Sequence, residues 1–145
     1  MKIRFLPRFA LGAALFLAAS GAALADRTPS PAGAEAYIVS PKDGAKVKGP
    51  VTVVFGLKGM GIAPAGIKFD NTGHHHLLID TEVPANLSLP LAADEHNVHF
   101  GKGQTETTLT LPPGTHTLQL VLADHLHTPH VPAVISKKVT ITVEK

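Results

Sequence analysis

Cysteine is absent from the 145-residue sequence, and this absence excludes several kinds of site at once. Without thiols the chain forms no disulfide, no thiolate zinc site and no cysteine-ligated blue-copper centre. Methionine is almost as scarce, with two residues in the chain. One of these is the first residue and the other is Met60, which argues against a methionine-rich carrier of Cu(I).

The N-terminal segment has the pattern of a secretory signal peptide. Three basic residues among the first eight precede an apolar run over residues 9–19, and small residues follow up to Asp26. The apolar run is too short for a permanent transmembrane helix. We therefore expect residues 1–25 to be cleaved, leaving a periplasmic or secreted protein with no membrane attachment.

Excess positive charge is also lacking once that segment is set aside. The whole chain has 13 Lys and Arg, and removing the three basic residues leaves 10 against 11 acidic residues, a formal charge of −1. No basic patch with interleaved aromatic residues remains, so the sequence predicts no nucleic-acid partner.

A helical stripe is the last absence, and short runs that alternate apolar and polar residues take its place. Such runs include residues 51–57, 107–111 and 118–122, a last strand is expected over residues 134–143, and Pro and Gly separate the runs. About seven short strands of this kind predict an all-β fold, an immunoglobulin-like two-sheet β-sandwich over residues 37–145. Residues 26–36, rich in Pro and Ala, are expected to form a flexible leader.

Histidine, in contrast, is abundant. Most of the nine histidines lie in two runs, residues 73–80 (Gly-His-His-His-Leu-Leu-Ile-Asp) and residues 124–130 (Asp-His-Leu-His-Thr-Pro-His). Imidazole is the commonest protein ligand for zinc and copper, so these runs predict a metal site. In the expected topology the strand that begins at His74 lies antiparallel to the strand that ends near Ala123. The two runs therefore meet at one end of the sandwich.

Strand parity then divides the rings between two faces, because residues two apart on a strand point the same way. His74 and His76 share the outer face with Asp80, whose charge suggests that this face is solvated, whereas His75 points toward the core. The predicted metal ligands are His74, His76, His125, His127 and His130. Three further residues are candidates for an extra ligand or for a group that supports a ligand: His75, His99 and Asp124. Asp124 is expected either to form a hydrogen bond with His75 or to orient a ligand.

Four sequence blocks carry a resemblance to a known family: residues 73–80, 99–106, 113–118 and 124–130. They resemble the signature blocks of a secreted bacterial family known as domain of unknown function 4399, over about residues 37–143. That family implies no activity. The segment Ser40–Val47 also resembles the first strands of periplasmic copper-resistance sandwiches of the CopC type, which commonly place a histidine at the mature N-terminus, where this chain has Asp26.

Three classes of function follow from these observations. We favour a periplasmic module that binds Cu(II) or Zn(II) for buffering, resistance or delivery, with copper slightly preferred because nitrogen-rich sites favour Cu(II). The second class is a copper-dependent redox enzyme of superoxide-dismutase-like chemistry, since that sandwich also carries His-x-His on a strand. The His-Glu-x-x-His and Gly-x-Ser-x-Gly motifs are absent, which argues against zincin and esterase chemistry. The third class is a binding or structural module without a metal.

Overall fold

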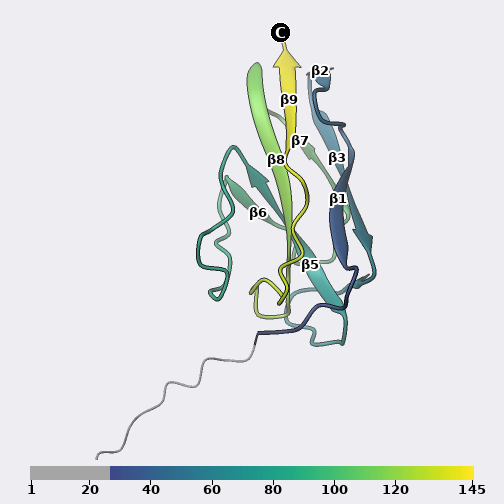
Figure 1. The fold of residues 1–145 in the computed structure, drawn as a ribbon. Helices are drawn as coiled ribbons and strands as arrows, with labels where there is room; N and C mark the ends of the chain where they lie inside the picture. Colours follow the sequence, from purple (N-terminus) through teal and green to yellow (C-terminus); the bar gives the residue numbers. More distant parts are fainter. Residues whose placement is uncertain (1–26) are drawn as a thin grey trace, which may run out of the picture.

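The computed structural model describes residues 27–145, so the predicted signal peptide at residues 1–25 lies outside the described part. Nine strands form two sheets packed face to face (Figure 1). No helix in the described part is long and apolar enough to cross a membrane. The strands are β1 (Glu35–Ser40), β2 (Lys46–Lys48), β3 (Val51–Lys58), β4 (Gly61–Ile62), β5 (Thr72–Ile79), β6 (Asn97–His99), β7 (Glu106–Leu109), β8 (Gly114–Ala123) and β9 (Val139–Glu144).

The order of the strands is that of an immunoglobulin-like sandwich. One sheet has the order β1-β3-β7 and the other has β2-β9-β8-β5-β4, with β6 also paired to β5. Immunoglobulin domains place strands A, B and E in one sheet and C, F and G in the other. Here β1, β3 and β7 take the first set of positions, and β5, β8 and β9 take the second. The predicted all-β sandwich is therefore confirmed, with short β2, β4 and β6 added at its edges.

The core lies between the two sheets and follows the period-two patterns of the sequence. Leu118, Leu120 and Leu122 of β8 are fully buried against Val53 and Phe55 of β3. Alternate residues of a strand point to one face, so each of these runs presents a continuous apolar surface to the opposite sheet. Removing this surface from water is the main force that holds the two sheets together.

The outer face of β5 is buried, in contrast to the solvated face that the sequence suggests. Residues 80–96 fold back over this face (Figure 1, left), and every residue from Gly73 to Ile79 is buried. Leu91 of the covering segment donates its backbone N–H to the His127 carbonyl at 2.8 Å, which ties the segment to the β8–β9 connection. A second apolar cluster beneath the segment consists of Leu78, Leu91, Val121 and Ala123.

The segment expected as a flexible leader lies along the β8–β9 connection instead. The Arg27 guanidinium donates hydrogen bonds to the Pro129 and His130 carbonyls. Ser30 and Val131 add backbone hydrogen bonds of 2.9 and 3.0 Å along the same segment. Because these bonds join sequence positions about a hundred residues apart, residues 27–34 and the sandwich form one unit.

The last strand is predicted over residues 134–143, but in the structure β9 begins at Val139. The Ser136 hydroxyl accepts the hydrogen bond of the Leu120 N–H at 2.8 Å. A side-chain oxygen thus takes the place of a backbone carbonyl, and the regular ladder is interrupted until Val139. The alternation of apolar residues over residues 134–143 gives no sign of this hydrogen bond, so the sequence pattern predicts a longer strand.

Candidate metal centre

Three elements bring histidines together on the outer face of β5. His74 and His76 point outward from β5, where His74 pairs with Ala123 of β8 and His76 pairs with His99 of β6. The end of β8 therefore lies beside the start of β5, as the topology predicts. The turn that follows β8 carries His127 to the same place. We refer to His74, His76, His99 and His127 as the histidine cluster.

The four rings of the histidine cluster are in mutual contact. One ligand nitrogen each from His74, His99 and His127 lies within 4.8 Å of the other two. The ring centres of these three residues are 4.8 to 5.2 Å apart. The His76 ring centre lies 4.9 Å from that of His99, 5.3 Å from that of His74 and 6.2 Å from that of His127.

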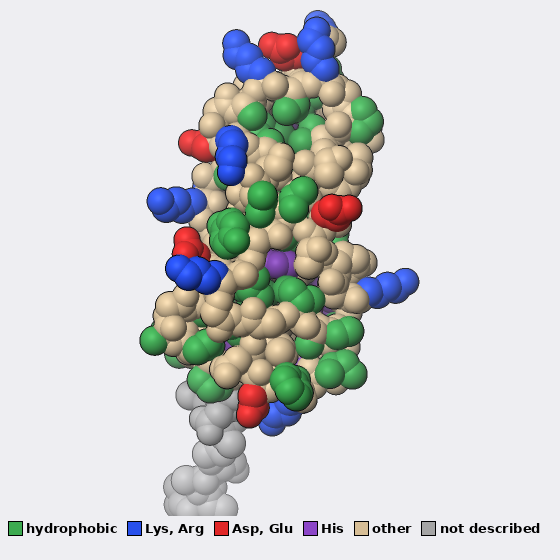
Figure 2. Space-filling model, turned by 90° about the vertical axis from the view of Figure 1, so that its right-hand side faces the viewer, with side chains coloured by type: hydrophobic (Ala, Val, Ile, Leu, Met, Phe, Trp, Pro, Cys, Tyr) green, Lys and Arg blue, Asp and Glu red, His purple; other side chains and the backbone are tan. Residues whose placement is uncertain are grey.

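Four of the eight ring nitrogens of this cluster are buried without a hydrogen-bond partner among the described residues. Both ring nitrogens of His74 and the Nε2 atoms of His76 and His99 are buried and unpaired. The His74 and His76 side chains are fully buried. Figure 2 shows the side of the molecule that lies to the right in Figure 1, away from β6, and little histidine surface is visible there. Buried polar groups almost always have a partner, because an unpaired one costs about 1–3 kcal/mol. A bound metal ion would use the lone pairs that these rings leave free.

Three rings of the cluster, His74, His76 and His99, have lowered pKa values, which favours the neutral state that binds metal ions. Burial, followed by the neighbouring rings, lowers the pKa of His74 to about 3. Burial also lowers the pKa of His76 to about 4, although the hydrogen bond to Asn97 partly opposes it. The pKa of His99 is lowered by burial and then by His127. These three rings therefore keep an unprotonated nitrogen at pH 7.

Asp124 shapes the turn that carries His127. Its Oδ1 accepts hydrogen bonds from the Leu126 N–H at 2.8 Å and the Thr128 N–H at 3.0 Å, and its Oδ2 accepts one from the Thr28 hydroxyl at 2.6 Å. Burial raises the pKa of Asp124, but these hydrogen bonds outweigh it and lower the pKa overall. His127 itself adopts a left-handed backbone with φ of 66°. Asp124 thus supports a ring of the cluster through the turn, and His75 has no hydrogen bond to it.

Two residues that the sequence analysis did not single out also support the cluster. The Asn97 side-chain oxygen accepts a hydrogen bond from His76 Nδ1 at 2.9 Å. Gly101 leaves room for the His99 ring, because a Cβ atom at that position would overlap it. The His-Phe-Gly sequence at residues 99–101 is a weak signal for the second feature. Nothing in the sequence marks Asn97, whose contact with His76 depends on the pairing of β6 with β5.

His75 points to the opposite side of β5, into the core, as strand parity predicts. Its ring packs edge-on against Phe55 with 5.2 Å between the ring centres. Burial, followed by the neighbouring His76, lowers its pKa to about 4. His75 is therefore separated from the cluster by the sheet itself.

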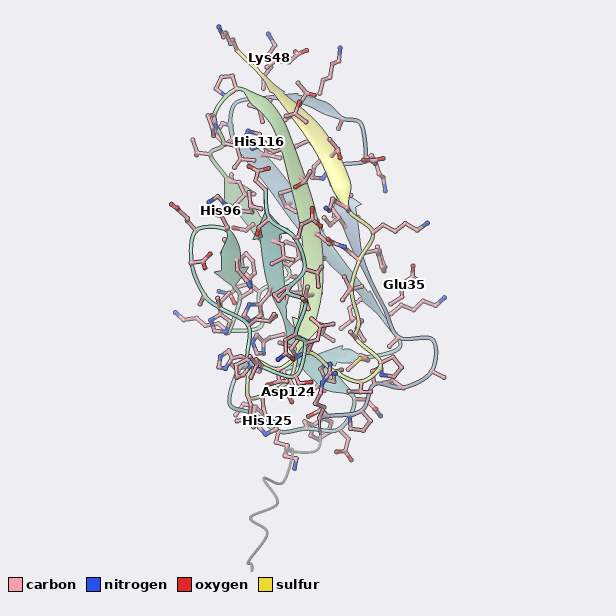
Figure 3. The ribbon with its side chains drawn as sticks, turned by 60° about the vertical axis from the view of Figure 1, so that its left-hand side comes forward. Glu35, Lys48, His96, His116, Asp124 and His125 are labelled. Carbon is pink, nitrogen blue, oxygen red and sulfur yellow. The ribbon has the colours of Figure 1, made fainter. Side chains whose placement is uncertain are left out.

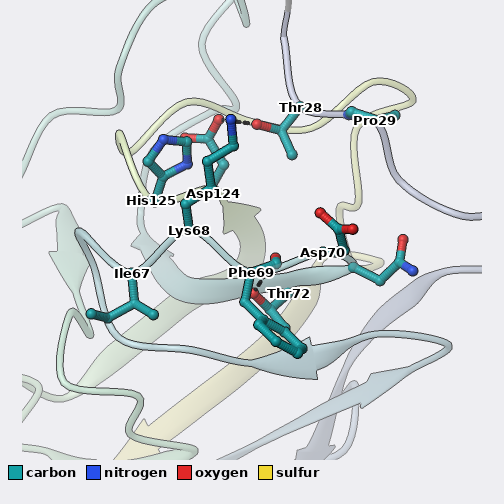
Figure 4. Close-up of a pocket in the computed structure, with 10 residues that line it drawn as sticks. Thr28, Pro29, Ile67, Lys68, Phe69, Asp70, Thr72, Asp124 and His125 are labelled. Carbon is teal, nitrogen blue, oxygen red and sulfur yellow. Dashed lines mark hydrogen bonds between the residues drawn. The ribbon is translucent and has the colours of Figure 1, made fainter.

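Two of the predicted ligands lie outside the cluster. His125 lines a surface pocket with Thr28, Lys68 and Asp124 on the other side of the turn (Figure 4). His130 is fully buried and donates from Nε2 to the Thr72 carbonyl at 3.1 Å. The turn between β8 and β9 thus brings only one of its three histidines, His127, to the rings of β5 and β6.

His116 lies toward the opposite end of the sandwich from Asp124 and His125 (Figure 3). Its Nδ1 donates to Asp80 Oδ2 at 2.7 Å and its Nε2 donates to the Pro112 carbonyl at 2.8 Å. Both nitrogens can donate only in the charged form, and the pKa of His116 is raised, chiefly by the hydrogen bond to Asp80. This ring holds the corner before β8 in place.

The chain belongs to the family described as a domain of unknown function, DUF4399, whose model matches residues 53–144 and includes all four rings of the cluster. Among solved structures, the fibronectin(III)-like modules of Clostridium thermocellum CbhA are similar to this chain at 12% identity, with a TM-score of 0.34, over 74% of this chain and 92% of that chain. A comparison with curated proteins finds no match. The predicted family is confirmed, and the resemblance to CopC-type sandwiches stays a prediction.

Proposed function

We propose that this domain binds one divalent transition-metal ion, Cu(II) or Zn(II), through His74, His99 and His127. The observation that carries the proposal is the convergence of three ligand nitrogens within 4.8 Å around His74, whose two nitrogens are buried and unpaired. His116 and His130 have hydrogen-bond partners, whereas both nitrogens of His75 are buried and unpaired in the core. What distinguishes His74 from His75 is that nitrogens of two other histidines converge on it.

The spacing of the three nitrogens suits a single ion. With a metal–nitrogen distance of about 2.0–2.1 Å, the nitrogens of a tetrahedral site lie about 3.4 Å apart. Nitrogens within 4.8 Å of one another need only shift inward by about 1 Å, which small rotations of the side chains provide. Imidazole nitrogen suits zinc, copper and nickel rather than magnesium or calcium, which require oxygen ligands.

The surroundings of the cluster suit a module that takes up and releases an ion. His99 and His127 are partly exposed, whereas His74 is fully buried, so an ion would enter past the outer two rings. The signal-peptide pattern supports action in the periplasm, and we propose that the role there is buffering or delivery of the ion. Nitrogen ligands bind Cu(II) more tightly than Zn(II) at equal availability, so the occupant depends on which ion reaches the protein.

Titration of the purified, chelator-treated protein with Zn(II) and with Cu(II) tests the proposal. We expect one ion per chain by isothermal titration calorimetry and a rise in melting temperature with either ion. His74→Leu should abolish both effects, and the matched control His125→Ala, from the same end of the sandwich, should retain them. The proposal is wrong if neither ion binds at micromolar concentration, or if His74→Leu binds as the wild type does.

A further inference from the structure

We infer that His76 is a fourth ligand, that the four rings surround the ion as a closed tetrahedron, and that Asn97 is the residue that positions His76. This inference rests on the proposed metal binding and adds the coordination number and geometry of the site. It is carried by the hydrogen bonding of His76 and by the distances between the four ring centres.

The hydrogen bond of His76 fixes which of its nitrogens is free. The Asn97 side-chain oxygen accepts from Nδ1 at 2.9 Å, so the proton of the neutral ring is on Nδ1 and the lone pair is on Nε2. That Nε2 atom is buried and has no hydrogen-bond partner in the described part of the chain. Metal-bound histidines typically donate their second nitrogen to an oxygen in this way, which sets the tautomer and the ring direction.

The amide of Asn97 is itself held in place. Its side chain is 5% exposed, and its backbone lies opposite Leu78 in the pairing of β6 with β5. The Asp94 carboxylate accepts hydrogen bonds from the backbone N–H groups of Asn97 and His96, both at 2.8 Å, and so fixes the turn that leads into β6. The oxygen that orients His76 therefore sits on a strand rather than on a free loop, which favours a well-defined ring position.

The ring centres are spaced as in a tetrahedron, although the ligand nitrogens that lie within 4.8 Å of one another are those of His74, His99 and His127, so the His76 ring must turn toward them on binding. An imidazole centre lies about 3.2 Å from a metal bound at about 2.05 Å, so the centres of four tetrahedral rings lie about 5.2 Å apart. The six distances in the cluster run from 4.8 to 6.2 Å and average 5.2 Å.

A square-planar arrangement does not fit the same distances. It would separate two opposite pairs of ring centres by about 6.4 Å each. In the cluster only the pair His76–His127, at 6.2 Å, is farther apart than 5.3 Å, and His74–His99, which would be the second opposite pair, is at 4.9 Å. Cu(II) would thus be held away from the tetragonal geometry that it prefers, whereas Zn(II) has no such preference.

Four protein ligands leave no position on a zinc ion for a water molecule or a substrate. Catalytic zinc sites keep one position open, whereas zinc sites with four protein ligands are closed. A closed tetrahedron therefore argues against zinc-dependent hydrolysis at this centre and favours simple binding of the ion.

Cobalt(II) provides a direct probe of this geometry. A four-coordinate tetrahedral Co(II) ion lacks an inversion centre and absorbs visible light strongly, whereas a six-coordinate ion absorbs weakly. We expect the wild-type protein to bind one Co(II) with the strong bands and to lose them when one equivalent of Zn(II) displaces it. Weak bands from bound Co(II) would overturn the closed tetrahedron and leave the proposed metal binding intact.

Variants at positions 76 and 97 test the fourth ligand. His76→Leu should weaken Zn(II) binding by at least roughly 10-fold and remove the strong Co(II) bands. Asn97→Leu should weaken Zn(II) binding roughly 10- to 100-fold. Asn97→Asp should restore binding, because a carboxylate also accepts the Nδ1 proton. His96→Ala, at the position next to Asn97, is the matched control and should behave as the wild type does.

The outcomes separate this inference from the function on which it rests. If His76→Leu remains folded by circular dichroism and binds Co(II) with unchanged affinity and spectrum, His76 is not a ligand and only the present inference fails. The positioning role fails if Asn97→Leu and Asn97→Asp bind equally well. If the wild-type protein binds neither Co(II) nor Zn(II), the inference is wrong, and if it does not bind Cu(II) either, the proposed function is wrong as well.

Discussion

Replacing His74 by leucine separates a metal ligand from a structural histidine, because the two roles predict opposite changes in stability. The His74 side chain is fully buried and neither nitrogen has a hydrogen-bond partner in the part of the chain that the structure describes. Leucine has a similar volume and no polar atom to leave unpaired. We therefore expect the metal-free variant to be more stable than the metal-free wild type, by about 1–3 kcal/mol.

Adding metal should stabilise the wild type and leave the stability of His74→Leu unchanged. An ion present at 100 times its Kd stabilises the wild type by about 2.7 kcal/mol. For a folded domain of this size, each kcal/mol shifts the melting temperature by about 4 °C, so the shift on adding metal is about 11 °C. His74→Leu removes the central ring of the cluster, and its melting temperature should not respond to Zn(II) or Cu(II).

Differential scanning calorimetry of both proteins, with and without chelator, measures all four states. Urea denaturation at 25 °C checks the free energies of unfolding independently. A metal-free His74→Leu protein that is less stable than the metal-free wild type, together with a wild type that gains nothing from metal, would refute the reasoning. His74 would then contribute to packing, and its unpaired nitrogens would have another cause.

Two further predictions concern the surroundings of the cluster and the opposite end of the domain. Gly101→Ala should push the His99 ring aside and weaken Zn(II) binding at least tenfold in calorimetric titration, whereas Gly61→Ala, where the added carbon meets only an ordinary contact of 3.4 Å, should leave binding unchanged. The pair of His116 and Asp80 should stabilise the fold most between pH 3.8 and 6.5, the ordinary pKa values of the two groups, because the folded-state pKa of Asp80 is lowered and that of His116 is raised. The difference in free energy of unfolding between wild type and His116→Ala should therefore shrink as the pH rises through the raised pKa of His116. The same difference should shrink as the pH falls through the lowered pKa of Asp80. A difference that is constant from pH 3 to pH 9 would contradict this.

Local periodicity was enough to predict the fold class and part of the cluster. Alternating apolar residues require strands, and a strand places His74 and His76 on one face and His75 on the other. The order of the strands then brings the start of β5 beside the end of β8, so the meeting of the two histidine runs could be predicted too. These features depend on neighbouring residues and on a strand order that many sandwiches share, and so they can be derived from the sequence.

The remaining members of the cluster depend on contacts between distant parts of the chain. His99 joins the cluster because β6 pairs with β5 after an intervening segment of weak periodicity. The choice of His127 rather than His125 depends on a turn held by Asp124 and by the hydroxyl of Thr28, a residue almost a hundred positions away.

Burial of the outer face has the same origin. Asp80 indicates a solvated surface when strand parity alone is considered, yet residues 80–96 fold back over β5 and exclude water from the rings. The sequence by itself determined which side chains share a strand face. Only the tertiary structure decided which rings face one another and which of their nitrogens remain unpaired, because hydrogen bonding and burial depend on segments that meet only in the folded chain.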